Sequence, residues 1–393
     1  GTFDRVVDGA GKVLLPGFVN AHTHLPMTLM RGYGGGCDLH TWLNQYIFPA
    51  EARLDSRAVA AGAGLGLAEM IASGVTCVAD MYMHTGTIAE QILEAGISAN
   101  LSCGGVYFGA PEDFSPETCG DCRNQAALTE EWHGAGAGQI LVDASVHGEY
   151  TSNPPLWRWM AEYAAEHRLG MHVHVSETQS EHQASLERWG KTPIQALDGC
   201  GVWDCGRSLA AHCVYTTEED WALMAEKGIS CVHNPWSNLK LGSGVAPIPA
   251  MMRAGVNVVL GTDGMSSHNS ADLFSDIKLA AVLHNGVERD PMAVSAWAAL
   301  EMATVNGARA LGRDTGVIAP GKTADLILVD LSAPNLIPCH DPVEDLVFSA
   351  HGSNVEMNMA RGQVIYEKGS FLTLDLERVR WEVEHYALPL IFG

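Results

Sequence analysis

Short β-branched runs alternate with longer amphipathic stretches along most of the 393-residue chain, and this alternation constrains the fold more than any other feature. The candidate strands are 17–20, 75–80, 97–101, 140–146, 171–175, 208–211, 229–233 and 256–261. The clearest candidate helices between them are 57–72, 156–167, 218–227 and 273–284. Gly74, Gly96, Gly170, Gly228 and Gly255 stand just before strands, where glycines that end helices are common. Eight repeats predict an α/β fold, a (β/α)8 TIM barrel. An open doubly wound sheet is the alternative, although it would usually carry fewer strands.

Beyond Gly307 the pattern changes to short strands broken by Pro-Gly, Arg-Gly and Lys-Gly pairs. The candidate strands are 316–319, 324–330, 355–361 and 363–367, followed by a helix near 374–385, and residues 3–15 have a similar strand-and-turn character. We therefore expect the barrel over residues 16–312, a small β-sandwich-like accessory domain formed by both chain ends (1–15 and 313–370), and a C-terminal helix and tail over 371–393. Any larger N-terminal β portion would lie outside this sequence.

The charge balance limits the classes of partner. Acidic residues outnumber basic ones by 46 to 23, which gives a formal charge of −23. Nucleic-acid polymers and anionic membranes both bind basic patches, so neither is an expected partner, whereas a small neutral substrate is compatible with this charge. The apolar runs are far shorter than a membrane span, and no basic-then-apolar leader opens the sequence. The ten cysteines lack disulfide-framework spacing, which predicts reduced thiols and a cytoplasmic protein.

His22 and His24 follow the apolar run 15–21, so we expect them at the C-terminal end of a buried strand. Side chains on a strand repeat every second residue, and both imidazoles therefore point the same way. Two converging neutral imidazoles are suitable ligands for a borderline metal such as zinc. The pair alone is equally compatible with two polar residues at a strand end, one of them solvated.

The ends of the other candidate strands carry similar residues, and in an α/β barrel the chemistry occurs at these ends. They are His147 after the fourth strand, His174 and Glu177 after the fifth, His212 after the sixth and Asp263 after the eighth. Core histidines would be scattered, whereas these gather at one barrel mouth. His172 lies one layer deeper than His174 on the same strand face, and we expect it to be a hydrogen-bonded core histidine.

Several motifs occur in a fixed order: PGFVNAHTHL (16–25), HVSE (174–177), AHCV (211–214), SNLKLGSG (237–244), GTDG (261–264) and GVIAPGKTADLILVD (316–330). Together they resemble the amidohydrolase superfamily over the chain from Val13 to Lys368. The segments 38–54 and 233–248 are most similar to the branch of 5′-methylthioadenosine/S-adenosylhomocysteine deaminases and related aminohydrolases. The resemblance implies that His22, His24, His174 and Asp263 bind a divalent metal.

The number of metals follows from a missing residue. Binuclear members of the superfamily bridge two metals with a carboxylated lysine at the end of strand 4, and this chain has no lysine between Lys12 and Lys191. We therefore expect one divalent ion. Three imidazoles and one carboxylate suit zinc, and iron, manganese or cobalt stay open.

The residue types suggest a hydrolytic mechanism. A divalent metal lowers the pKa of a bound water towards about 7. Asp263, which would also face that water, can take its proton, and His212 would hydrogen-bond the water. Glu177 would protonate the ring nitrogen next to the attacked carbon and then help ammonia leave. Such a carboxyl group should have a raised pKa in an enclosed apolar site.

The expected substrate is a 6-aminopurine nucleoside: methylthioadenosine, adenosine or S-adenosylhomocysteine. By the resemblance, Glu51 would bind the ribose hydroxyls and His147 the purine, with Trp42 in the apolar wall beside Glu51. Members that use S-adenosylhomocysteine carry an arginine near the position of Cys103, and here there is none. Arg123, further along the loop, is a candidate substitute.

Two alternative functions stay open at this point, together with the oligomeric state. A ribose-free heterocycle of the guanine, cytosine, pterin or triazine type would have no diol for Glu51 to hold. A non-catalytic protein on the same scaffold would typically have lost metal ligands, and this chain retains them. The aromatic run 157–159, Trp-Arg-Trp, is a candidate interface of a homo-oligomer.

Overall fold

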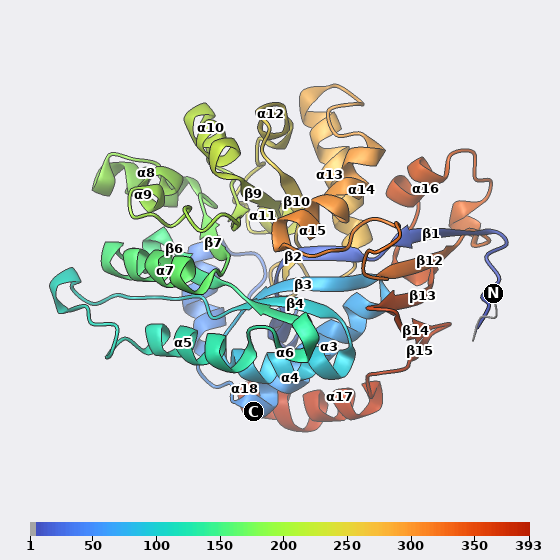
Figure 1. Ribbon diagram of the computed structural model, residues 1–393, viewed down its shortest axis with the longest axis horizontal. Helices are drawn as coiled ribbons and strands as arrows, with labels where there is room; N and C mark the ends of the chain where they lie inside the picture. Colours follow the sequence, from blue (N-terminus) through green and yellow to red (C-terminus); the bar gives the residue numbers. More distant parts are fainter. Residues whose placement is uncertain (1–4) are drawn as a thin grey trace.

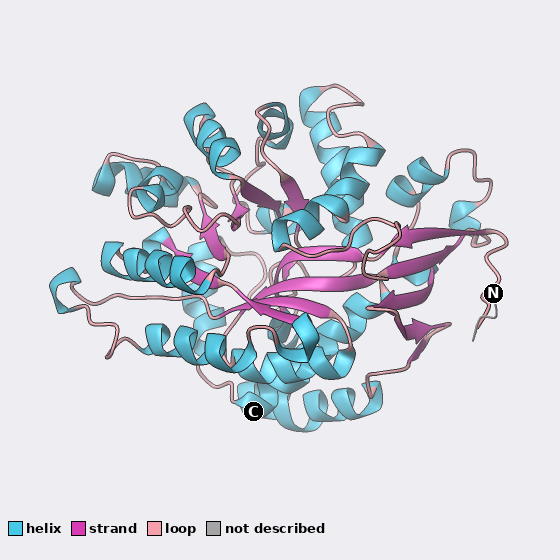
Figure 2. Cartoon of the chain, in the orientation of Figure 1, coloured by secondary structure: helices cyan, strands magenta, loops and turns pink. Residues whose placement is uncertain are grey.

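The structure, a computed structural model, describes residues 5–393 and contains a closed barrel of parallel strands (Figures 1 and 2). One sheet has the order β11-β2-β3-β4-β5 and the other β10-β9-β8-β7-β6. The strands are β2 (Phe18–His24), β3 (Val75–Met81), β4 (Ser98–Ser102), β5 (Ile140–Val142), β6 (Ala144–Gly148), β7 (Met171–Val175), β8 (Ser208–His212), β9 (Ile229–His233), β10 (Val258–Leu260) and β11 (Asp263–Gly264). Because β5 continues into β6 and β10 into β11, the fourth and eighth barrel strands each change partner midway and join the two sheets. The predicted α/β class and parallel barrel are confirmed.

The two breaks are held by buried polar side chains. Asp143, between β5 and β6, accepts hydrogen bonds from Asn100 on β4 (2.8 Å) and from the backbone of Gly170 before β7 (3.1 Å). Asn20 on β2 pairs with both the hydroxyl and the backbone N–H of Thr262, between β10 and β11. Gly261 leaves no room for a side chain, because a Cβ atom there would lie 2.9 Å from the Cβ of His22. The barrel is therefore closed by specific hydrogen bonds at positions that interrupt the regular ladder.

Helices surround the barrel, and the longer ones follow its strands. They are α1 (Leu39–Trp42), α2 (Phe48–Glu51), α3 (Ser56–Ala72), α4 (Thr85–Ala95), α5 (Gly120–Trp132), α6 (Ala135–Gly138), α7 (Pro154–His167), α8 (Gln179–Trp189), α9 (Pro193–Asp198), α10 (Glu218–Lys227), α11 (Pro235–Lys240), α12 (Ile248–Arg253), α13 (Leu273–Glu288), α14 (Ala296–Met302), α15 (Val305–Leu311), α16 (Pro342–Phe348), α17 (Leu376–Glu382) and α18 (Leu388–Phe392). Short 3-10 turns are η1 (Leu25–Met30), η3 (Pro111–Asp113), η4 (Glu149–Thr151), η5 (Pro334–Leu336) and η6 (Gly352–Asn354), and π-helical turns are η2 (Leu43–Ile47) and η7 (Val383–Ala387). No helix in residues 5–393 is long and apolar enough to cross a membrane.

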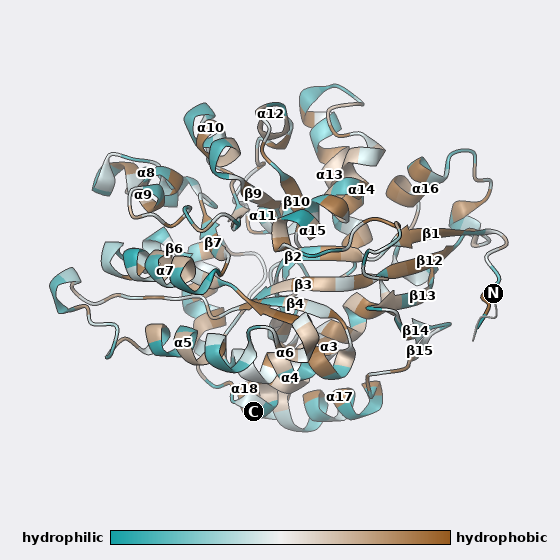
Figure 3. Ribbon diagram, viewed as in Figure 1, coloured by the Kyte–Doolittle hydropathy of each residue, from teal (hydrophilic) through white to brown (hydrophobic). Residues whose placement is uncertain are grey.

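Glycines end several of these helices as predicted. Gly96 and Gly228 have φ angles of 87° and 68°, the left-handed conformation that stops α4 and α10. The prediction for Gly170 is wrong, because Arg168 takes the left-handed position after α7 with φ 57°. Figure 3 shows that α10, on the outside of the barrel, is largely hydrophilic, whereas β1 and β12 are hydrophobic.

Beside the barrel lies one antiparallel sheet in the order β1-β12-β13-β14-β15. Its strands are β1 (Lys12–Pro16), β12 (Leu326–Asp330), β13 (Val355–Ala360), β14 (Gln363–Glu367) and β15 (Ser370–Phe371). The register of β1 with β12 brings the two ends of the chain together. The described residues form a single sheet here and no second facing sheet, and the candidate strand 316–319 is irregular. The domain boundaries at residues 15, 312 and 370 stay a prediction, and residues 1–4 lie outside the described residues.

The C-terminal helical segment extends further than predicted and comprises α17, the π turn η7 and α18. This segment packs on α3, where Arg57 pairs with Glu382 and lies over the ring of Tyr386.

The aromatic run 157–159 is less exposed than an interface would require. Trp157 is buried, with its indole N–H donating to Ser152 at 2.7 Å, because it faces the barrel from α7. The homo-oligomer therefore stays a prediction, and the buried Trp157 does not support it.

Candidate metal centre and active-site cavity

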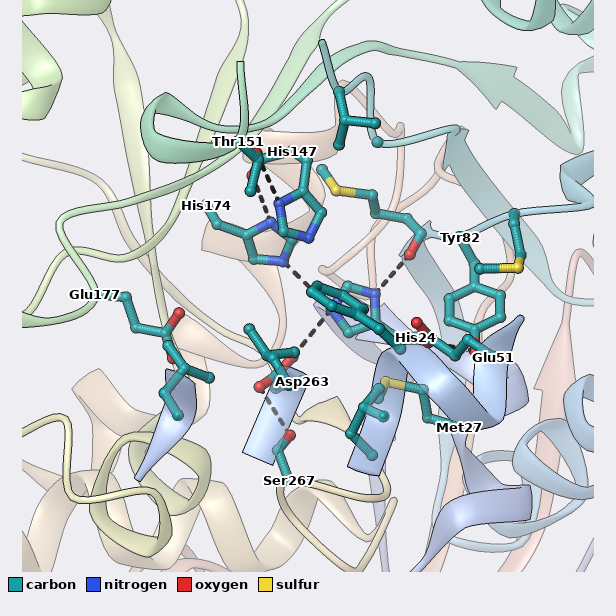
Figure 4. Close-up of a pocket in the computed structure, with 18 of the residues that line it drawn as sticks. His24, Met27, Glu51, Tyr82, His147, Thr151, His174, Glu177, Asp263 and Ser267 are labelled. Atoms are coloured by element: carbon teal, nitrogen blue, oxygen red, sulfur yellow. Dashed lines mark hydrogen bonds and ion pairs between the residues drawn. The ribbon is translucent and has the colours of Figure 1, made fainter. Parts of the chain in front are cut away.

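A cavity of about 420 Å³ opens at the carboxyl ends of the barrel strands (Figure 4). The residues on its floor come from the strand ends that the sequence analysis singled out: His24, His147, His174, Glu177, His212 and Asp263. Its walls come from the segment between β2 and α3 and from the loops after β3 and β4. His22 is fully buried beneath this floor. The structure therefore brings the predicted polar residues together at one barrel mouth.

Four of these side chains converge on one point. The Nε2 atom of His24 lies 3.1 Å from Asp263 Oδ1 and 3.3 Å from His174 Nε2. His22 Nε2 lies 3.4 Å from Asp263 Oδ1. Tetrahedral ligands at zinc bond lengths of about 2.0–2.1 Å are about 3.3 Å apart, so these separations fit one small cation.

Hydrogen bonds on the outer ring nitrogens orient these imidazoles. His24 Nδ1 is 2.5 Å from the carbonyl of Met81, and His174 Nδ1 is 2.7 Å from the carbonyl of His147. A carbonyl only accepts, so each Nδ1 carries a proton, which leaves each Nε2 lone pair facing the cluster when the ring is neutral. A hydrogen bond from the outer ring nitrogen to a backbone carbonyl is typical of metal-binding histidines.

His22 supplies the clearest test of whether a cation fits. Its Nε2 atom is buried without a hydrogen-bond partner, a costly state unless a cation accepts the lone pair. Burial lowers the pKa of His22 to about 3, so the ring is neutral and able to ligate at pH 7. Its Nδ1 atom lies 2.8 Å from Nε2 of His172, which confirms the expectation that His172 is a hydrogen-bonded core residue.

Asp263 provides the negative charge of the cluster. Its Oδ2 atom accepts hydrogen bonds from the hydroxyls of Ser237 (2.6 Å) and Ser267 (2.8 Å), so Oδ1 points to the histidines. Burial opposes ionisation, but the neighbouring imidazoles of His22 and His24 hold the pKa of Asp263 well below its usual range. Burial alone would lower the pKa of His24, but the hydrogen bond to Asp263 and the negative charge of that carboxylate raise it to about 9. The carboxylate thus attracts positive charge to this point.

His212 lies at the same point as the predicted ligands. Ligand atoms of His22, His174, His212 and Asp263 all lie within 4.8 Å of one another, a group that includes His212 and leaves out His24. We favour His24 as the ligand, because its Nε2 directly contacts both Asp263 and His174, whereas His212 Nε2 is 3.8 Å from Glu177 Oε2. His212 Nδ1 is fixed by Asn238 at 2.8 Å.

Glu177 lies on the floor beside His212 and is almost completely buried. Burial raises its pKa, partly offset by the nearby His212. The loop that carries it is held by Glu181, which accepts hydrogen bonds from the backbone of Ser176 (2.8 Å) and Glu177 (2.7 Å) and caps α8 together with Thr178. The four residues of this capping box, 178–181, directly follow Glu177 in the sequence, so the start of α8 fixes the position of Glu177.

Glu51 lies at the end of α2 in the cavity wall, where Figure 4 shows it next to Tyr82 and His24. Its Oε1 atom accepts a 2.6 Å hydrogen bond from the hydroxyl of Tyr82. Burial raises the pKa of Glu51. Trp42 is buried in the same wall, and its indole N–H donates to the carbonyl of Tyr33 at 3.3 Å. The sequence analysis missed Tyr82, because a single tyrosine after a strand carries no periodic signal.

His147 lines the cavity above His174, with ring centroids 4.8 Å apart. Its Nδ1 atom contacts the hydroxyl of Thr151 at 3.1 Å, and burial lowers its pKa to about 4, so it is neutral at pH 7. Arg123 is exposed on α5 and does not line the cavity, so the structure does not support it as a substitute for the missing arginine.

Comparison with known proteins agrees with this geometry. Residues 13–365 match the amidohydrolase family. The chain is 42% identical over 389 residues to the 5-methylthioadenosine/S-adenosylhomocysteine deaminase of Dictyoglomus thermophilum, covering 99% of this chain and 90% of that protein. It is 40% identical over 390 residues to the 5′-deoxyadenosine deaminase of Methanothermobacter thermautotrophicus, with the same coverage.

A solved structure is similar as well. The adenosine deaminase from Xanthomonas campestris with bound zinc superimposes with a TM-score of 0.91 at 33% identity, over 97% of this chain and 86% of that one. Since the family match spans residues 13–365 and these relatives align nearly end to end, this chain belongs to the amidohydrolase family.

Proposed function

We propose that this protein is a metal-dependent hydrolase that deaminates a 6-aminopurine nucleoside to the 6-oxo product with release of ammonia. The observation that carries the proposal is the placement of two buried glutamates on one cavity, Glu177 beside His212 on the floor and Glu51 in the wall. The names of the relatives, which are deaminases of methylthioadenosine, S-adenosylhomocysteine and 5′-deoxyadenosine, support the same chemistry.

In this proposal His22, His24, His174 and Asp263 hold one divalent ion, with zinc favoured by the donor set and by the zinc in the similar solved structure. When bound, the ion supplies Lewis acidity that makes a water molecule acidic near neutral pH. Ser237 and Ser267 donate to Oδ2 of Asp263 and so direct Oδ1 toward the histidines, where the ion would lie. The ionised carboxylate beside the ion would take a proton from the reacting water.

Glu177 and His212 then handle the remaining protons and charge. A carboxyl with a raised pKa can deliver a proton to the purine ring nitrogen next to the attacked carbon and later to the departing amine. His212, anchored through Nδ1 by Asn238, presents its Nε2 atom to the charge that develops on the attacking oxygen. His147, neutral at pH 7, is placed to contact the purine.

Glu51 distinguishes this proposal from hydrolysis of a ribose-free heterocycle. A carboxylate accepts two hydrogen bonds from a vicinal diol, and burial in an apolar wall strengthens them. A triazine or free base has no such group, so Glu51 would be buried at a cost without benefit. The methylthioadenosine or adenosine type of substrate is favoured over S-adenosylhomocysteine, because no arginine of the described residues, 5–393, lines the cavity to bind an amino-acid carboxylate.

An ammonia-release screen of the purified holoenzyme tests the proposal. The panel contains adenosine, 5′-deoxyadenosine, 5′-methylthioadenosine, S-adenosylhomocysteine, adenine, guanine and an aminated triazine. We expect the highest kcat/KM for the nucleosides without a carboxylate. A clear preference for a free base or triazine would contradict the proposal and favour the ribose-free alternative.

A further inference from the structure

The loop after β4 brings an acidic residue to the cavity that the mechanism above does not use. Asp121 is the second residue of α5, half-buried, and it lines the cavity together with Cys103, Val106 and Phe108. We propose that Asp121 sets the charge preference for the 5′-substituent of the nucleoside, so that neutral or cationic groups are accepted and carboxylates are rejected. This inference rests on the proposed function and names the substrate class more closely.

The carboxylate of Asp121 has a fixed position. Its Oδ2 atom accepts a 2.8 Å hydrogen bond from the backbone N–H of Val106. The bond ties the start of α5 to the loop that follows β4, so both segments face the same space. Asn124 is a weaker partner for Oδ1, at 3.5 Å, which leaves that oxygen with capacity to accept from a ligand.

The strand order places Asp121 near the expected position of the 5′ carbon. β3 pairs with β4, so the loop after β4 is the neighbour of Tyr82, which follows β3 and binds Glu51. With the purine on the floor and the 2′ and 3′ hydroxyls at Glu51, the 5′ carbon projects from the opposite face of the ribose. It therefore lies on the other side of the ribose from Glu51, and the proposal places it at the wall that the loop after β4 contributes.

The charges of the cavity explain the direction of the preference. The charged side chains other than histidine that line it are Glu51, Asp121, Glu177 and Asp263, and no lysine or arginine of residues 5–393 joins them. A carboxylate on the 5′-substituent would lose water, meet no lysine or arginine of residues 5–393 and be repelled by Asp121. An ammonium group would be attracted by the same residue. Val106, Met83 and the exposed ring of Phe108 provide apolar contacts for a neutral substituent.

A matched series of three substrates tests the inference with the holoenzyme at pH 7. The series is 5′-amino-5′-deoxyadenosine, which is an ammonium, 5′-deoxyadenosine, which is neutral, and adenosine-5′-carboxylate. We expect wild-type kcat/KM to be lowest for the carboxylate by about tenfold or more, as for one unfavourable charge contact in a partly buried site. Asp121→Asn should reduce the ammonium-to-carboxylate ratio about tenfold, because asparagine retains an oxygen for the Val106 N–H and loses the charge.

Asp113→Asn is the control, since Asp113 is an exposed acid on the same loop that does not line the cavity. The Asp113→Asn variant should have the same ammonium-to-carboxylate ratio of kcat/KM as the wild-type enzyme. The inference is overturned if Asp121→Asn leaves the ratio unchanged, if Asp113→Asn lowers it equally, or if the wild-type enzyme itself prefers the carboxylate. The wild-type comparison keeps the test valid even if Asp121→Asn folds poorly. Absence of ammonia from all three substrates would instead contradict the deaminase proposal, and this inference with it.

Discussion

His22 Nδ1 lies 2.8 Å from His172 Nε2, and His172 Nδ1 lies 3.4 Å from the hydroxyl of Ser102. These three residues form a hydrogen-bonded chain beneath the metal centre, inside the barrel and out of contact with the cavity. For His22 to present a lone pair at Nε2, its Nδ1 must carry the proton and His172 must accept it. His172 is therefore a positioning residue, which acts through His22.

Replacing His172 should weaken metal binding without touching a ligand. We expect His172→Leu to reduce metal affinity by about 10–100-fold, because His22 loses the partner that fixes its ring and tautomer. His172→Gln, which can accept the same hydrogen bond, should restore part of the loss. Competition with a chelator measures the affinity, and His167→Leu, on the exposed end of α7, is the control. Equal affinities for wild type and His172→Leu would mean that His22 is oriented by packing alone.

The metal content itself is a second prediction. Purified protein should contain one divalent ion per chain, since the ligand atoms around Asp263 converge on one point and no lysine lies at the end of the fourth strand. Removing the ion with a chelator should abolish turnover. It should also lower Tm, because a ligand that binds only the native state and is present at a concentration of 100 times its Kd contributes about 2.7 kcal/mol to the free energy of unfolding. Elemental analysis and thermal melting measure both effects, and two ions per chain would contradict the assignment.

Glu177 and His212 should separate metal binding from catalysis. We expect Glu177→Gln to retain the metal and lose about 10²–10⁴-fold in kcat, because an amide cannot transfer a proton. His212→Asn should likewise retain metal and lose rate, since His212 Nε2 faces Glu177 at 3.8 Å. Metal analysis of each variant alongside its turnover gives the comparison. Metal loss in Glu177→Gln comparable to its loss of rate would assign Glu177 a structural role.

Much of the barrel is predictable from sequence, because its strands are apolar and its helices are bounded by caps. The predicted ranges 171–175, 229–233 and 218–227 coincide with β7, β9 and α10. The break of the fourth strand at Asp143 was not predicted, since we interpreted the run 140–146 as one strand and the partner change depends on hydrogen bonds to Asn100 and Gly170. Tertiary contacts, which have no local pattern, decide such features.

The residues of the site were likewise only partly predictable from the sequence. The histidines and acids of the floor were predictable because strand ends of a barrel converge. Ser237 and Ser267, which orient Asp263, and Tyr82, which binds Glu51, were not predicted, since hydroxyl groups are common in loops and their role depends on which oxygen they reach. Arg123 has no support as a substitute for the missing arginine, because its position in the sequence did not reveal that it is exposed on α5 and does not line the cavity.

The pH dependence of substrate binding should report on Glu51. Burial raises the pKa of Glu51, so its carboxylate gains a proton at a pH above the ordinary value of about 4.3. As pH falls through that raised pKa, the charge that accepts the ribose hydroxyls is lost, and kcat/KM for a nucleoside should fall. Glu51→Gln should lack this acid limb, while both enzymes share any loss of metal at low pH. The ratio of wild-type to Glu51→Gln kcat/KM, followed from pH 8 to pH 5, should therefore decrease, and a constant ratio would contradict the assignment.

Substitution of Glu51 gives the sharpest test of the ribose assignment. Each charge-assisted hydrogen bond from a diol to a buried carboxylate contributes roughly 1.5–3 kcal/mol. Glu51→Gln keeps the size of the side chain and an oxygen for the Tyr82 hydroxyl, so the wall should stay intact. We expect it to lower kcat/KM for adenosine or methylthioadenosine by about tenfold or more, and to leave any activity on the free base nearly unchanged, since adenine on the cavity floor does not reach Glu51. Equal losses on nucleoside and free base would mean that Glu51 supports the fold of the wall, and would favour a ribose-free substrate.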